Sequence, residues 1–136
     1  NIRHFRDEID PNQEMDIQIN NEEKLIIPKG VDVYEIDGPY FFGIANKFDE
    51  IMSTIANKPK VRIIRMRRVP FMDSTGIHNL EILINQSNKE NIHVVLSGVN
   101  ESVRKSLEKA DFTKLLPSEN ICANINIAIE RSKQLL

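Results

Sequence analysis

The clearest structural signals of the chain lie in residues 61–77, Val61-Arg-Ile-Ile-Arg-Met-Arg-Arg-Val-Pro-Phe-Met-Asp-Ser-Thr-Gly-Ile77. Its first part is rich in β-branched and other apolar residues, which is typical of a central strand covered on both faces. Pro70 closes this strand, and the short polar residues at 73–75 are natural capping groups for a helix. We therefore predict a buried strand over 61–67 followed by a helix from about Ser74 to Lys89.

The alternation of strands and helices continues on both sides of this stretch. Two more core strands are predicted at 31–37 and 92–97. Apolar residues at helical spacing predict a helix over 44–56, one that begins after Asn100, and a last helix. The third helix carries Val103, Leu107 and Ala110, and the last one carries Ile121, Ile125, Ala128 and Ile129. The expected order is β-α-β-α-β-α-β-α, an α/β domain with a small mixed sheet and helices packed on it.

Composition excludes several classes of protein. The 136 residues include 18 Lys and Arg against 20 Asp and Glu, a net charge of -2, so the basic excess of a dedicated nucleic-acid binder is missing. The sequence has no apolar run of about 20 residues and no signal-peptide layout. The single Cys122 excludes an internal disulfide and a multi-cysteine zinc site, and favours a reducing compartment.

Charge is unevenly distributed along the chain. Between Arg6 and Lys24 there are seven acidic residues and no Lys or Arg, so residues 1–23 are interpreted as an acidic tether or edge segment, and residues 24–136 as the folded domain. The run from Lys58 to Arg68 holds six cations. It could face anionic lipid, an acidic partner or the acidic leader, or consist of solvated charges at strand ends. Because the chain begins with Asn, we expect it to be part of a longer protein.

The residues that could carry a function lie in the loop Asp73-Ser-Thr-Gly76. In one interpretation Asp73 caps the helix and Ser74 and Thr75 occupy its first turn. In the other, a hydroxyl at a helix N-terminus accepts phosphate, because free N–H groups and the helix dipole stabilise the added charge.

A hydrolase that uses Ser74 with His78, one turn later, is the enzyme alternative. It lacks a visible third orienting group and an oxyanion loop, so we predict no catalytic residue. The three histidines are far apart in sequence and predict no metal site. Neither a dinucleotide fingerprint nor a Walker loop is present.

The loop Met72-Asp-Ser-Thr-Gly-Ile77 resembles the signature loop of STAS domains, which are shared by sulfate transporters and anti-sigma-factor antagonists. Three further segments are similar to the C-terminal domain of bacterial sulfate permease (SulP) transporters. They are Val33-Tyr-Glu-Ile-Asp-Gly-Pro-Tyr-Phe-Phe-Gly43, Pro59-Lys-Val-Arg-Ile-Ile-Arg-Met-Arg-Arg-Val-Pro-Phe-Met-Asp73 and Leu96-Ser-Gly-Val99. The resemblance runs from about residue 27 to residue 132.

The resemblance implies a non-catalytic domain on the cytoplasmic face of the membrane, following a transmembrane anion-transport unit and regulating transport, assembly or trafficking. Its implied partners are that transmembrane unit, a cytoplasmic protein, and a second copy in a homodimer formed through the parent transporter. The phosphorylated hydroxyl of the antagonist branch maps onto Ser74, with Thr75 beside it. Nucleotide binding near this loop would involve Asp37, Gly38, Asp73 and Ser74, and no other cofactor is expected. The alternative is a free-standing phosphoswitch similar to anti-sigma-factor antagonists.

Overall fold

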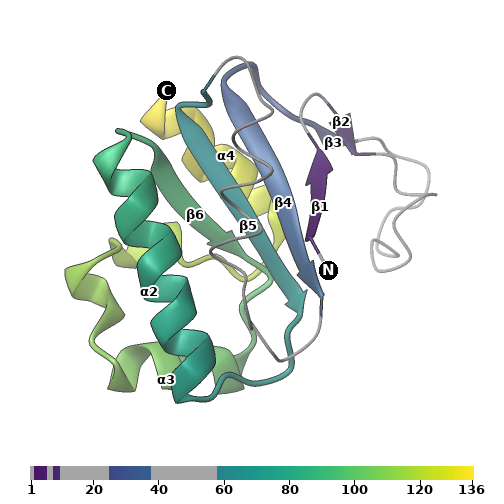
Figure 1. The fold of residues 1–136 in the computed structure, drawn as a ribbon. Helices are drawn as coiled ribbons and strands as arrows, with labels where there is room; N and C mark the ends of the chain where they lie inside the picture. The colour runs from purple at the N-terminus through teal and green to yellow at the C-terminus, as the bar shows by residue number, and fades with distance from the viewer. Residues whose placement is uncertain (1, 6–7, 10–24, 38–57) are drawn as a thin grey trace.

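The computed structural model describes residues 2–5, 8–9, 25–37 and 58–136 of the chain (Figure 1). The helix predicted over 44–56 and the residue Gly38 lie outside these ranges, as does most of the acidic segment 1–23.

A four-stranded mixed sheet forms the centre of the fold, in the order β1-β4-β5-β6. The strands β4 (Val31–Asp37), β5 (Val61–Arg68) and β6 (His93–Ser97) are parallel, and β1 (Ile2–Phe5) pairs antiparallel with β4. The three core strands confirm the sequence prediction to within a residue at each end. A separate two-stranded ribbon joins β2 (Glu8–Ile9) to β3 (Leu25–Ile26). The sequence did not predict β1, β2 or β3, which are too short for an alternating pattern to be recognised.

Helices cover both faces of the sheet (Figure 1). The helices α2 (Ser74–Lys89) and α3 (Glu101–Lys109) pack on one face, and α4 (Ile125–Leu135) packs on the other. The predicted bounds of α2 are confirmed, and Asn100 is the N-cap of α3 as predicted.

The segment between α3 and α4 differs from the expected order. It contains two short 3-10 helices, η1 (Phe112–Lys114) and η2 (Ser118–Asn120), and the strand expected before the last helix is reduced to a single parallel bridge between Leu96 and Ile121. Ile121 was predicted to lie on the last helix. It precedes that helix instead, because Asn124 is the N-cap and its side chain accepts a hydrogen bond from the Ile127 N–H.

The same segment covers the outer edge of β6. The Cys122 N–H donates to the Leu96 carbonyl over 2.8 Å, and the Asn120 side chain donates to the Val94 carbonyl over 2.9 Å. Arg131 of α4 donates to Asn120 Oδ1 over 2.7 Å and so ties the last helix to this cover. Backbone groups of an edge strand that would otherwise be open to another chain are thereby occupied.

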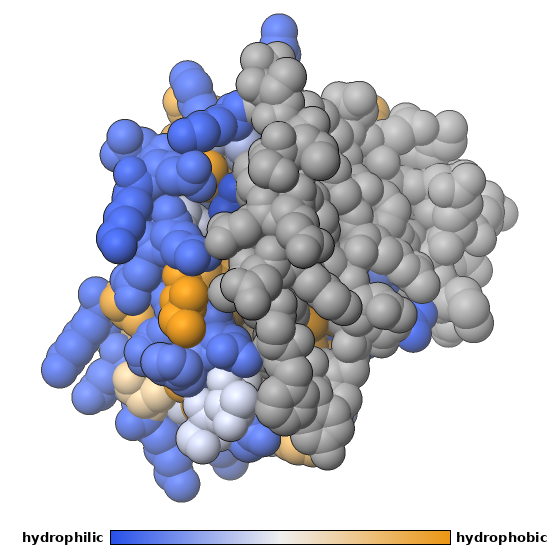
Figure 2. Space-filling view, in the orientation of Figure 1, coloured by the Kyte–Doolittle hydropathy of each residue, from blue (hydrophilic) through white to orange (hydrophobic). Residues whose placement is uncertain are grey.

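Two hydrophobic clusters lie on opposite sides of the sheet. Ile64 and Met66 of β5 pack against α2 and α3, whereas Ile63 of the same strand packs against α4. Both faces of β5 are therefore covered, which explains why its apolar residues point to both sides of the sheet instead of alternating with exposed polar ones. The visible surface on the α2 side is mostly hydrophilic in its described part and has only small separate hydrophobic spots (Figure 2).

Candidate functional site

The signature loop lies at the carboxyl ends of the parallel strands, where it connects β5 to α2. The side chain of Asp73 caps α2: its Oδ1 accepts a hydrogen bond of 2.8 Å from the Gly76 N–H. Ser74 and Thr75 are exposed on the first turn of the helix, and Gly76 is buried. The capping role predicted for Asp73 is confirmed, and the two hydroxyl-bearing side chains are accessible from solvent.

The loop between β6 and α3 lies against the end of β5 and the residues that lead into the signature loop. Gly98 has a φ of +72°, and a Cβ on it would come within 2.8 Å of the Arg67 backbone nitrogen. Next to it, the Asn100 side-chain amide donates to the carbonyls of Val69 and Pro70, each over 3.2 Å. The loop after β6 therefore contacts the chain around the end of β5 at two positions, Gly98 and Asn100.

A groove of about 340 Å³ lies between the beginning of α2 and the end of α3. Ser74 and His78 both line it, but no hydrogen bond joins them among the described residues, and neither has a third orienting partner there. The geometry does not assemble the catalytic pair considered from sequence. The remaining lining residues are Met72, Asp73, Ile77, Glu81, Ser106, Lys109 and Ala110.

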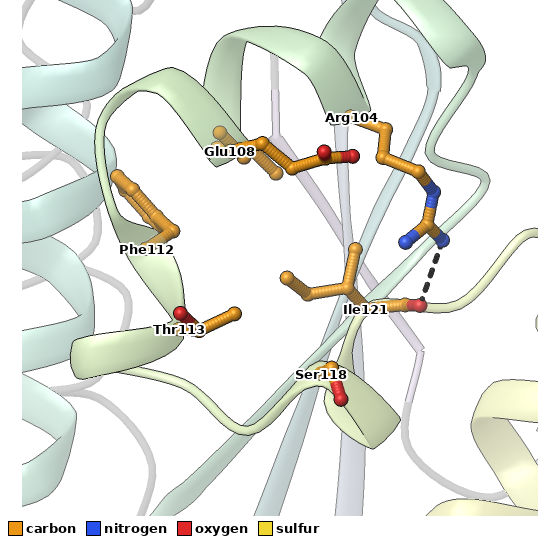
Figure 3. Close-up of a pocket in the computed structure, with 7 residues that line it drawn as sticks. Arg104, Glu108, Phe112, Thr113, Ser118 and Ile121 are labelled. Carbon is orange, nitrogen blue, oxygen red and sulfur yellow. Dashed lines mark hydrogen bonds between the residues drawn. The ribbon is translucent and has the colours of Figure 1, made fainter.

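A second groove of about 300 Å³ lies on the other side of α3 (Figure 3). Its rim carries Arg104 and Glu108, and its floor is formed by side chains that also belong to the core, among them Phe112. Arg104 Nη2 donates to the Ile121 carbonyl over 3.0 Å, so this guanidinium fastens α3 to the segment before α4. The sequence gives no sign of this groove, because its residues form no recognisable motif.

The basic run Lys58 to Arg68 does not form one exposed patch. Arg62 and Arg65 are each 2% exposed, and Arg62 Nη1 donates to the Ser87 hydroxyl over 2.7 Å. Arg67 Nη2 lies 2.6 Å from Oε1 of the buried Glu35, and Arg68 Nε lies 3.7 Å from the same oxygen. The guanidinium groups of this strand are thus largely buried and contact other side chains of the protein. The strand therefore does not supply a large cationic surface for lipid or an acidic partner.

The other candidate residues occupy separate places. Asp37 ends β4 and is in register with Arg68, at the same edge of the sheet as the signature loop. Cys122 is 3% exposed, and burial raises the pKa of its thiol more than the nearby guanidinium groups of Arg131 and Arg104 lower it. A buried thiol that stays protonated is a poor nucleophile. Within the described part of the chain, no group of His, Cys, Asp and Glu side chains has the arrangement of a metal site.

Comparison with known proteins defines the class. The model of the STAS domain family matches residues 24–128, and the chain belongs to this family. The resemblance drawn from the Asp-Ser-Thr-Gly loop is therefore confirmed.

Solved structures narrow the class to the transporter branch. The chain is 35% identical to a sulfate transporter family protein from Wolinella succinogenes, with a TM-score of 0.74, covering 86% of this chain and 93% of that one. It is 34% identical to the SulP transporter STAS domain from Vibrio cholerae, also with a TM-score of 0.74, covering 90% and 96% respectively. The similarity to SulP transporter STAS domains predicted from the sequence is thereby confirmed.

A curated relative places such a domain in a longer protein. Over 80 residues, or 58% of this chain, the sequence is 28% identical to "Putative sulfate transporter YvdB" of Bacillus subtilis (strain 168). The chain spans 15% of the length of that relative. Among the helices that the structure describes here, none has the length and apolar composition that a membrane span requires.

Proposed function

We propose that this STAS domain is a non-catalytic regulatory module of a SulP-type anion transporter, held at the cytoplasmic face of the membrane by the transmembrane unit of the same protein. It would modulate transport or assembly through the surface around the signature loop. The observation that carries the proposal is the pairing of a SulP-type STAS fold with an accessible first turn of α2 at Ser74 and Thr75. A cytoplasmic protein and a second copy of the transporter are the further partners that this role would involve.

The test uses the full-length protein that carries this domain. Uptake of labelled sulfate is compared for the wild type, Ser74→Ala and Ser74→Asp. Ser102→Asp is the matched control, because Ser102 is an exposed serine in the first turn of α3. We expect Ser74→Asp to change the uptake rate while Ser102→Asp does not. If both aspartate variants transport and assemble like the wild type, the loop has no regulatory role in transport.

The second candidate is the free-standing phosphoswitch, which is favoured by the exposed position of Ser74 at a helix N-terminus. Phosphate there would meet free backbone N–H groups of the first turn. Incubation with cell lysate and ATP, followed by intact-mass measurement, tests it: a mass increase of one phosphate that is lost in Ser74→Ala supports the switch. An unchanged mass leaves Asp73 capping as the main role of the loop.

Nucleotide binding by Asp37, Gly38, Asp73 and Ser74 is a separate proposal. It draws on the position of Asp37 and Asp73 at the carboxyl edge of the sheet, where α/β domains commonly bind ligands. Binding of labelled ATP or GTP to the purified chain, competed by unlabelled nucleotide and weakened by Asp73→Asn, is the expected result. Retention that unlabelled nucleotide does not displace would contradict it.

A further inference from the structure

The side chain of Asn100 meets two loops at once. Its Oδ1 accepts a 2.8 Å hydrogen bond from the Val103 N–H and thereby caps α3. Its Nδ2 lies 3.2 Å from the carbonyl oxygens of both Val69 and Pro70. An asparagine amide has one acceptor oxygen and two N–H donors, so a single side chain can satisfy all three contacts. Serine or aspartate would cap the helix equally well but could not make the two donations.

The two carbonyls belong to the chain that enters the signature loop. Val69 is buried, and its N–H donates to the Met66 carbonyl over 2.9 Å, so the start of the loop is fixed to the end of β5. Asp73, the cap of α2, follows three residues after Pro70. The amide of Asn100 therefore holds the part of the loop that positions both Asp73 and Ser74.

A second contact supports the same connection. Gly98 packs against the backbone of Arg67, and the Val99 N–H donates to the Cys122 carbonyl over 3.2 Å. The loop between β6 and α3 is thus enclosed between the end of β5 and the segment before α4. It has little freedom to move without its neighbours.

We propose that Asn100 is a positioning residue that couples the signature loop to α3. Asn100 caps the start of α3, and the other end of the same helix faces the start of α2 across the groove at Ser74. A contact or modification that displaces the loop would therefore reach the opposite wall by moving α3 through this side chain. The regulatory use of this coupling rests on the function proposed above. The coupling itself is a property of the 136-residue chain and is measured without any transporter.

Three variants separate the cap from the coupling. Asn100→Asp keeps the cap and places a carboxylate oxygen against the two carbonyls. Asn100→Ser keeps the cap, but its side chain is too short to reach the two carbonyls. Asn100→Ala loses both the cap and the hydrogen bonds to the carbonyls. Hydrogen exchange followed by NMR reports on the Gly76 and Ile77 amides, which both donate to Asp73. We expect these amides to exchange at least about fivefold faster in Asn100→Asp and Asn100→Ser, because about fivefold corresponds to one net hydrogen bond and both variants lose the two donations to Val69 and Pro70.

The slowest amides of β5 are the internal reference, because they report global unfolding. A purely structural role would act through global unfolding and would therefore accelerate Gly76 and Ile77 by no more than the β5 amides. The proposal is overturned if the loop amides exchange at the wild-type rate in Asn100→Asp and Asn100→Ser, or only in parallel with β5.

Transport assays of the full-length Asn100→Asp protein distinguish this proposal from the function on which it rests. Faster loop exchange with unchanged transport supports the coupling and contradicts the regulatory role. Unchanged loop exchange with altered transport contradicts the coupling and supports regulation by this domain.

Discussion

The contact between the two loops predicts that Gly98→Ala is among the most damaging small substitutions in this domain. A left-handed backbone costs a residue with a Cβ about 1–2 kcal/mol, and Gly98 has a φ of +72°. The added Cβ would also lie 2.8 Å from the Arg67 nitrogen and 2.9 Å from its Cα. These are backbone atoms at the half-buried end of a hydrogen-bonded strand, so relief requires displacement of the chain, and overpacking of this kind costs about 1–3 kcal/mol more. The sum is about 2–5 kcal/mol.

Gly30→Ala is the matched control for this prediction. Gly30 also has a positive φ, +92°, but among the residues that the structure describes its added Cβ would meet only the tip of the Leu136 side chain, at 3.3 Å. We expect Gly30→Ala to cost about 1–2 kcal/mol, the backbone part alone. Urea unfolding measures both, and with a slope of about 1–3 kcal/mol/M the midpoint of Gly98→Ala should fall clearly below that of Gly30→Ala. Equal midpoints for the two variants would refute the close approach of the loops.

Three further substitutions or treatments test the local structure. Asp73→Ala should lower the free energy of unfolding by about 1 kcal/mol through loss of the α2 cap, whereas Asp73→Ser should cost less; equal urea midpoints would contradict the capping role. Ser87→Ala should cost about 1–3 kcal/mol, because it removes an acceptor from the buried Arg62 guanidinium; a neutral effect in urea unfolding would mean that this bond is dispensable. The raised pKa of Cys122 predicts slower alkylation at pH 8 in the folded chain than in urea. Equal alkylation rates would show an accessible, ordinary thiol. Because the pKa of Cys122 is higher in the folded chain, the contribution of this thiol to stability is complete below the pKa of the unfolded thiol and is lost as pH rises through the pKa of the folded one.

The parts of this fold that sequence predicted are those with local signals. The strand from Val61, the helix Ser74–Lys89 and the caps at Asp73 and Asn100 follow from periodicity and capping chemistry within a few residues. The edge strand β1 depends on pairing with β4, about 30 residues later, and has no periodic pattern of its own.

The burial of Arg62 and Arg65 could not be predicted for a different reason. Charged residues are rarely buried without partners, and for Arg62 a partner is Ser87, 25 residues away on another element. The basic run therefore looked like a surface feature. Its interpretation required the tertiary contacts that place guanidinium groups beside Ser87 and Glu35.

At the candidate site, too, the sequence motif locates a residue, Ser74, but not its surroundings. Those surroundings determine how phosphorylation of Ser74 would act. The motif locates Ser74, but its neighbour Asp73 already accepts the Gly76 N–H, so a phosphate on Ser74 would stand beside a carboxylate that uses part of the helix N-terminus. Like charges at this spacing oppose each other, and Lys109 across the groove is exposed and screened by water. The expected net effect is a weaker Asp73 cap and a looser loop rather than a more stable α2. Because Asn100 bonds the same loop to α3, the disturbance would reach the opposite wall of the groove, where a partner surface would respond to it.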